Sequence, residues 1–268
     1  MFRLGYYQFR PHFGNIKGNL NQVLKGLQNA QADLIVLPEL PFSGYHFQSR
    51  EEAVALAENP GQSATVEALV GLCRRQNFYL VTGFNEKQGE TLYNSALLLG
   101  PEGLVHTYRK VHLFNDEKKW FAPGDTPFSV QTVRGVKIGM MICFDWIFPE
   151  ACRSLAVAGA EVVCHPSNLV LTYCQQTMLS RCIENGIFAV TANRFGADER
   201  PHGTLNFTGQ SQIVAPKGKL LHRSAAKRSE LFITEIDPAL ARDKKMTALN
   251  DIMADRRPEF YGGLAKSE

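Results

Sequence analysis

The sequence has no long apolar segment and almost no net charge. Its longest apolar stretch, residues 138–144, is far shorter than the roughly 20 residues of a transmembrane helix, and its first residues lack the apolar region of a signal peptide. The 268 residues contain 29 Lys and Arg against 26 Asp and Glu, a formal net charge of +3 with no concentrated basic field. We therefore expect a cytoplasmic protein that binds neither membranes nor nucleic acid.

Cysteine is too sparse for a disulfide-rich scaffold, and several common catalytic motifs are missing. The six cysteines include no C-x-x-C pair and no histidine at zinc-finger spacing from such a pair. The chain also lacks the G-x-G-x-x-G and Walker A loops, the H-E-x-x-H zinc motif and the G-x-S-x-G serine elbow. These absences predict reduced thiols and disfavour nucleotide-driven, zinc-protease and serine-elbow chemistry.

Short apolar runs alternate with amphipathic segments, and this alternation predicts an α/β fold. Helices are expected from about residue 15, at 65–77, from Pro149 and at 174–186. Strands are expected at 2–9, 33–37, 78–84, 92–99, 104–108, 136–142, 161–164, 187–192, 209–215, 220–222 and 231–236. Because no linker or fixed-period repeat interrupts them, we predict a single domain over residues 1–249.

The last 19 residues, 250–268, differ from the rest of the chain. They are polar, with the isolated apolar residues Ile252, Met253, Phe260 and Tyr261. A frayed terminus and an arm docked on this chain or on a partner are equally compatible with that pattern.

Three reactive residues each follow a predicted strand, where ligands bind in open α/β sheets. Glu39 lies between two prolines in LPELPFSGY, Lys110 ends LVHTYRK, and Cys143 follows the apolar run VKIGMMI. Taken alone, Glu39 is typical of an exposed acid on a loop, Lys110 of a lysine that extends to solvent, and Cys143 of a small buried apolar residue. We expect the Cys143 thiol to be partly exposed near the next helix N-terminus, which favours thiolate. Together the three groups suffice to hydrolyse an amide-like bond through a covalent intermediate.

At these residues the chain resembles the nitrilase superfamily, the carbon–nitrogen hydrolases, whose members carry a Glu-Lys-Cys triad in this order. LPELPFSGY, YRKVHLF and GMMICFDWIFPE match the three motif blocks, and Glu117 in NDEKKWFAPGD looks like the family's second glutamate. HPSNLV, RCIENGIFAVTANRFG, GQSQIVAPKGKLL and DRRPEFY extend the resemblance over essentially the whole chain. The resemblance implies a four-layer αββα sandwich and a homodimer or larger assembly, with residues 250–268 as an interface arm.

The resemblance also implies a mechanism. Glu39 is expected to act as general base for Cys143, Lys110 and the backbone N–H of Phe144 to hold the oxyanion, and Glu117 to orient Lys110. The intermediate is a thioester, and no metal, nucleotide or organic cofactor is required. The other five cysteines are expected to be packing residues, and His165 beside Cys164 lacks a third group that would make a catalytic pair.

Aromatic residues near these blocks are expected to line the substrate pocket, although core packing explains each of them about as well. The predicted lining residues are Tyr45, Phe114, Trp120, Phe144, Trp146 and Asn168. They favour a small apolar or flat substrate, with Asn168 as a polar contact. True nitrilases tend to have Trp-Glu after the cysteine, whereas this chain has Phe-Asp, which favours amide or N-carbamoyl hydrolysis over nitrile hydrolysis. Hydrolysis of a small amide is the expected function. N-carbamoyl amino acid hydrolysis, an aliphatic nitrilase activity, acyl transfer through the same thioester and a non-catalytic role are the alternatives.

Overall fold

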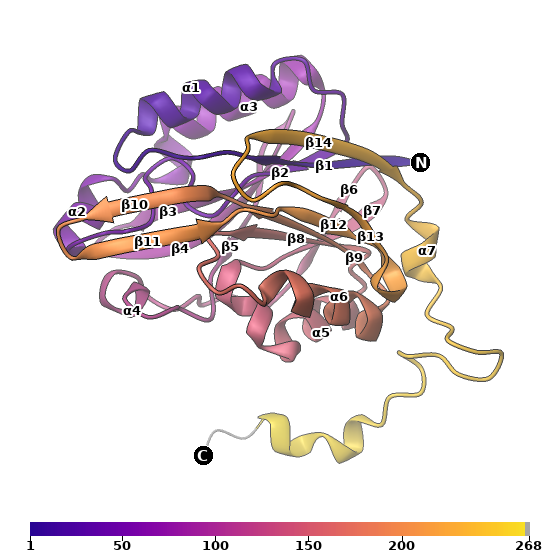
Figure 1. The fold of residues 1–268 in the computed structure, drawn as a ribbon. Coiled ribbons are helices and arrows are strands. Elements are labelled where there is room, and N and C mark those ends of the chain that lie inside the picture. Colours follow the sequence, from indigo (N-terminus) through magenta and orange to yellow (C-terminus); the bar gives the residue numbers. More distant parts are fainter. Residues whose placement is uncertain (266–268) are drawn as a thin grey trace.

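Two six-stranded sheets pack face to face, and helices cover both outer faces (Figure 1). The computed structural model describes residues 1–265. In spatial order the first sheet contains β14 (Glu230–Ile236), β1 (Phe2–Gln8), β2 (Leu34–Val36), β3 (Tyr79–Gln88), β4 (Thr91–Gly100) and β5 (Gly103–Arg109). The second contains β13 (Leu220–Arg223), β12 (Gln212–Val214), β9 (Phe188–Asn193), β8 (Val162–Ser167), β7 (Val136–Met140) and β6 (Val130–Val133). The predicted four-layer αββα sandwich is confirmed.

Each sheet has three parallel strands at its centre and antiparallel strands at its edges. β1, β2 and β3 are parallel in the first sheet, as are β7, β8 and β9 in the second. β2 shows how one strand serves two layers: Leu34 and Val36 lie in the core between the sheets, whereas Ile35 and Leu37 lie in the core under the outer helices. Burying each such side chain contributes about 1.5–3 kcal/mol, so the period-two alternation fixes this strand's register.

Two long helices cover each outer face. α1 (Ile16–Leu27) and α3 (Ala64–Gln76) pack on the first sheet, and α5 (Pro149–Val157) and α6 (Cys174–Asn185) on the second (Figure 1). The side chain of Asn15 accepts from the Gly18 N–H to cap α1, and that of Ser63 caps α3 in the same way. The shorter helical elements are α2 (Arg50–Ala55), α4 (Glu117–Trp120), α7 (Ala239–Arg242), η1 (Pro60–Gln62), η2 (Cys143–Ile147), η3 (Pro216–Gly218), η4 (Pro258–Phe260) and η5 (Gly262–Ala265).

A two-stranded ribbon, β10 (Phe195–Arg200) and β11 (Gly203–Thr208), extends beside the sandwich (Figure 1). The sequence interpretation missed it because its residues are mostly polar and only partly buried, so they show no apolar alternation. The four-residue edge strand β6 and the short helices α2 and α4 were missed for a related reason, since each is too brief for a periodic pattern.

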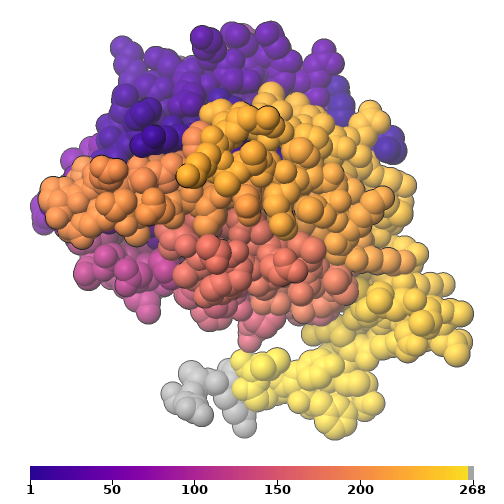
Figure 2. Space-filling view, in the orientation of Figure 1, coloured from indigo at the N-terminus to yellow at the C-terminus, as the bar shows by residue number. Residues whose placement is uncertain are grey.

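The C-terminal segment leaves the sandwich after α7 and runs along its lower side (Figures 1 and 2). Met253 packs against the main core, but Phe260 and Leu264 are each 72% exposed. Residues 266–268 of the predicted arm lie outside the described residues. None of the helices within residues 1–265 is long and apolar enough to cross a membrane.

Candidate functional site

Glu39 lies on the loop after β2, and tight backbone packing against β3 fixes its direction. The N–H of Gly83 donates to the Pro38 carbonyl at 3.1 Å. A Cβ on Gly83 would come within 2.5 Å of the Glu39 Cα, so only glycine allows this approach. Asn168 Nδ2 donates to the Glu39 carbonyl at 2.9 Å. The backbone at Glu39 is therefore held from both sheets.

The two oxygens of the fully buried Glu39 carboxylate have different environments. Oε1 accepts from Lys110 Nζ and from Asn94 Nδ2, each at 2.7 Å. Oε2 is buried and has no hydrogen-bond partner within residues 1–265. A buried carboxylate oxygen without a donor is costly, and it is free to accept a proton from a reacting group.

Lys110 follows β5 and joins two carboxylates. Its backbone N–H donates to the Asn94 carbonyl at 2.8 Å. Its ammonium lies 2.7 Å from Glu39 Oε1 and 2.7 Å from Glu117 Oε1. Burial alone would lower the pKa of Lys110, but the charges of Glu117 and Glu39 outweigh it and hold that pKa above its usual value. Lys110 is therefore a fixed cation.

Glu117 is placed by α4 and by two further hydrogen bonds. The Tyr45 hydroxyl donates to its Oε1 at 2.7 Å, and the Phe114 N–H donates to its Oε2 at 3.1 Å. Burial raises the pKa of Glu117 to about 7, while Lys110 acts in the opposite direction. With both carboxylates ionised, the two negative charges and the Lys110 ammonium leave a buried net charge of −1.

Cys143 is the first residue of η2, directly after β7 and Met141-Ile142. Its φ is +40°, a left-handed conformation that side chains with a Cβ seldom adopt. His165 Nε2 donates to the Cys143 carbonyl at 2.9 Å and supports this conformation. Burial lowers the pKa of His165 to about 4, so its imidazole is neutral. Its hydrogen bond to Cys143 is to the backbone carbonyl and not to the thiol.

The expectation of a partly exposed thiolate at Cys143 is wrong. Cys143 is only 6% exposed, and α5 begins at Pro149, with η2 in between. Burial and then the charge of Glu39 hold the pKa of Cys143 well above its usual value, although Lys110 lowers it. The resting group is a thiol, so its attack on a substrate requires a base.

All six predicted lining residues lie in two small adjoining pockets. A pocket of about 10 Å³ beside Cys143 is lined by Phe114, Phe144, Trp146 and Asn168 together with Leu169, Val170 and Leu171. A second, of about 60 Å³, is lined by Tyr45, Phe114, Trp120 and Glu117 together with His46, Phe47, Asn115, Asp116, Val170 and Leu205. Among residues 1–265, no arginine or lysine lines either pocket.

The polar contacts of these pockets differ from the prediction in detail. The amide nitrogen of Asn168 donates one of its two hydrogens to the Glu39 carbonyl, and its Oδ1 has no hydrogen-bond partner among residues 1–265. The Tyr45 hydroxyl is likewise bonded to Glu117. Leu205, on the unpredicted ribbon β10–β11, and Asn94, on β4, were missed because single polar or apolar residues on a strand carry no motif.

The other five cysteines are buried and free, as is Cys143. Burial raises the pKa of Cys73 and of Cys152 to about 12, and raises that of the remaining three as well. Cys164 lies in the core between the sheets, and the neighbouring His165 bonds Cys143 and Thr191 instead. Within residues 1–265, no cluster of three or more His, Cys, Asp and Glu side chains could hold a metal ion.

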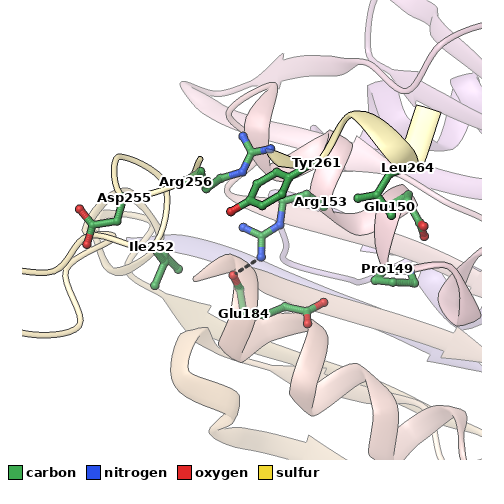
Figure 3. A pocket seen from close by; sticks show the side chains of 9 residues that line it. All are labelled: Pro149, Glu150, Arg153, Glu184, Ile252, Asp255, Arg256, Tyr261 and Leu264. Carbon is green, nitrogen blue, oxygen red and sulfur yellow. Dashed lines mark hydrogen bonds between the residues drawn. The ribbon is translucent and has the colours of Figure 1, made fainter. Parts of the chain in front are cut away.

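A larger cavity, of about 540 Å³, lies elsewhere, between the C-terminal segment and helices α5 and α6 (Figure 3). Arg153 crosses it and donates to the Glu184 carbonyl at 2.7 Å. Its lining residues are Pro149, Glu150, Arg153, Glu184, Ile252, Asp255, Arg256, Tyr261 and Leu264. No cysteine, serine or histidine is among these lining residues, so the size of the cavity does not make it the reaction centre.

Comparison with known proteins agrees with this geometry. The chain matches the carbon-nitrogen hydrolase family model over residues 3–246. A nitrilase from Pyrococcus abyssi is 42% identical over 264 residues, covering 97% of this chain and 99% of that protein. An (R)-stereoselective amidase from Pseudomonas sp. is 35% identical over 255 residues, covering 93% and 89%. A glutamate-to-glutamine mutant of the amidase from Nesterenkonia sp. AN1, showing Michael addition of acrylamide at its active-site cysteine, aligns with a TM-score of 0.81 and 25% identity over 98% of this chain and 100% of that one.

Proposed function

The chain belongs to the carbon–nitrogen hydrolase family of the nitrilase superfamily, and from its site we propose that it hydrolyses a small neutral amide to a carboxylic acid and ammonia. The observation that carries this proposal is the Oε2 of Glu39, which has no hydrogen-bond partner among residues 1–265, on a carboxylate that binds the Lys110 cation and whose charge raises the pKa of the Cys143 thiol. In this proposal Glu39 is the base, Cys143 the nucleophile and Lys110 the oxyanion partner, and all three are buried.

In the first half-reaction, Glu39 Oε2 takes the proton from Cys143 as Sγ attacks the amide carbon. The carbonyl π pair moves to oxygen, and Lys110 and the Phe144 N–H, near the start of η2, hold the oxyanion. When the carbonyl re-forms, the C–N bond breaks and the nitrogen leaves as ammonia with the proton from Glu39. A thioester on Cys143 remains.

In the second half-reaction, Glu39 takes a proton from water, which attacks the thioester carbon. The C–S bond breaks, the acid leaves, and Cys143 recovers its proton from Glu39. Glu117 keeps its hydrogen bond to Lys110 throughout and so holds the ammonium toward the oxyanion. The net reaction is amide plus water to acid plus ammonia.

The pocket walls support a substrate that is short and uncharged. Both pockets have mainly aromatic and aliphatic walls, and the charged groups in the larger one are the carboxylates Asp116 and Glu117. Because two carboxylates repel an anionic substrate and no arginine among residues 1–265 lines either pocket, N-carbamoyl amino acids fit poorly. The Phe144-Asp145 pair after the nucleophile supports an amide over a nitrile.

An ammonia-release screen tests this assignment. Acetamide, propionamide, an ω-amido acid, an N-carbamoyl amino acid and an aliphatic nitrile are compared with the wild type and with Cys143→Ala. Short neutral amides should give the highest kcat/KM, and the variant should give none above background. Preferential release from a nitrile or a carbamoyl acid would contradict the substrate class. Hydroxamate exceeding free acid in the presence of hydroxylamine would favour acyl transfer.

Residues 250–268 are proposed to form an arm that packs on a second copy of this chain. Phe260, Tyr261 and Leu264 present apolar surface to solvent, and Tyr261 and Leu264 line a cavity that lies against α5 and α6. An apolar segment exposed to water in this way is typical of an interface. Deleting residues 250–268 should convert a dimer to a monomer in light scattering coupled to size-exclusion chromatography. An unchanged mass would contradict the proposal.

A further inference from the structure

Asp145, which lies two residues after the nucleophile, is a fully buried carboxylate that no step of the proposed reaction uses. It accepts four hydrogen bonds from two separate segments. Oδ2 accepts from the Tyr108 hydroxyl at 2.7 Å and from the Ile142 N–H at 2.8 Å. Oδ1 accepts from the His112 N–H at 3.1 Å and from His112 Nδ1 at 2.8 Å. Hydrogen bonds to an ionised acceptor are stronger than those between neutral groups, so Asp145 forms a rigid junction between these two segments.

The four donors come from positions that bracket the reactive groups. Tyr108 is two residues before Lys110 and His112 is two residues after it, while Ile142 immediately precedes Cys143. The His112 ring also stacks on Phe148, just past η2, with ring centroids 3.8 Å apart. A single carboxylate thus ties the Tyr108 side chain on one side of Lys110, and the His112 backbone and ring on the other, to the turn that carries Cys143.

This junction accounts for two features of the site: the strained backbone of Cys143 and the separation of Lys110 from Cys143. The left-handed backbone of Cys143 is strained and persists only where its surroundings hold it. In addition, Lys110 and Cys143 come from different sheets, with β5 in one and β7 in the other, so the packing of either sheet alone does not set their separation. A misplacement of about 1 Å can lower turnover by 10²-fold.

We propose that Asp145 is a positioning residue that, through Tyr108 and His112, fixes the separation between Lys110 and Cys143. The inference rests on the proposed function, in which Cys143 attacks the amide carbon and Lys110 stabilises the charge on the oxygen bonded to that carbon. Asp145 does not touch substrate and exchanges no proton in this scheme.

Tyr108→Phe is the principal test, because it removes one donor while keeping the ring and the net charge. Tyr6→Phe is the matched control, since that buried hydroxyl also makes a hydrogen bond, to Ser224 at 2.8 Å, but touches neither segment. Steady-state kcat and KM for propionamide are measured with the melting temperature of each variant. A loss of stability common to both variants is thereby separated from a loss of positioning.

Tyr108→Phe should lower kcat by about 10- to 100-fold with KM within about twofold, whereas Tyr6→Phe should keep kcat within about twofold. Asp145→Asn should lower kcat further, because an amide NH₂ would face two donors on one side. Tyr108→Phe with kcat within twofold of wild type would overturn the inference, as would an equal loss in Tyr6→Phe.

A second readout needs no knowledge of the substrate. The rate at which iodoacetamide alkylates Cys143, followed by peptide mass spectrometry at about pH 8, depends on the Lys110 charge that lowers the pKa of the thiol. It should fall severalfold in Tyr108→Phe and stay unchanged in Tyr6→Phe; equal rates in all three proteins would contradict the inference. If no amide is turned over by the wild type, the proposed function fails while this measurement still decides the positioning role.

Discussion

Replacing Glu39 by glutamine should remove the base while preserving the shape of the site. The glutamine carbonyl oxygen can occupy the Oε1 position and accept from both Lys110 and Asn94, as the carboxylate does at 2.7 Å. The amide NH₂ then occupies the Oε2 position, where it can donate a proton but cannot accept one. Turnover should fall by about 10²- to 10⁴-fold, the usual contribution of a general base. Because Glu39 acts in both half-reactions, we expect a value near the upper end.

The Cys143 thiol should remain reactive in Glu39→Gln. The Glu39 charge raises the pKa of the thiol and Lys110 lowers it, so removing the carboxylate charge leaves the lowering influence in place. Alkylation by iodoacetamide should therefore continue, at no less than about a tenth of the wild-type rate. Ammonia release, peptide mass spectrometry and a melting curve test the three expectations. Turnover within tenfold of wild type would refute the role of Glu39 as base, and loss of the folded state would refute the shape argument.

Three further predictions concern stability and pocket size. Because folding raises the pKa of Glu117 from 4.5 to about 7, its contribution to stability is fully present below pH 4.5 and is lost as pH rises through 7. Glu117→Gln should therefore melt no lower than wild type at pH 8 while kcat falls, and a lower melting temperature would contradict this sign. Gly83→Ala should lower both melting temperature and turnover because its Cβ would lie 2.4 Å from the Leu40 nitrogen. The control Gly71→Ala, in α3, should leave the melting temperature unchanged or raise it. Equal melting temperatures and turnover in the two variants would refute the packing argument. Leu205→Ala should raise kcat/KM for hexanamide relative to acetamide by about tenfold, and an unchanged ratio would remove Leu205 from the substrate pocket.

Much of the fold could be predicted from the sequence because most residues of its buried strands are apolar and its outer helices are amphipathic. The hairpin tip at Gly100 and the helix start at Pro149 were visible from turn and cap chemistry. The pairing of the two sheets was not, since it depends on contacts between residues far apart in the chain. It entered through the family resemblance.

The residues of the candidate site that belong to sequence motifs could be predicted, and the others could not. Glu39, Lys110 and Cys143 each follow a strand, and the structure brings Glu39 and Lys110 to 2.7 Å. Asn94 and Asp145 were not singled out, because a buried polar residue on a strand or turn reveals its partners only when the chain is folded. The thiolate prediction failed for a similar reason, since the burial that raises the pKa of Cys143 is a tertiary property.

Trapping the covalent intermediate tests the central claim most directly. Wild-type protein mixed with propionamide and quenched in acid within the first turnovers should carry a propionyl group on the peptide that contains Cys143. The adduct should be absent from Cys143→Ala, which should also release no ammonia above background. Wild-type turnover without an adduct on Cys143, together with undiminished ammonia release by Cys143→Ala, would contradict the account.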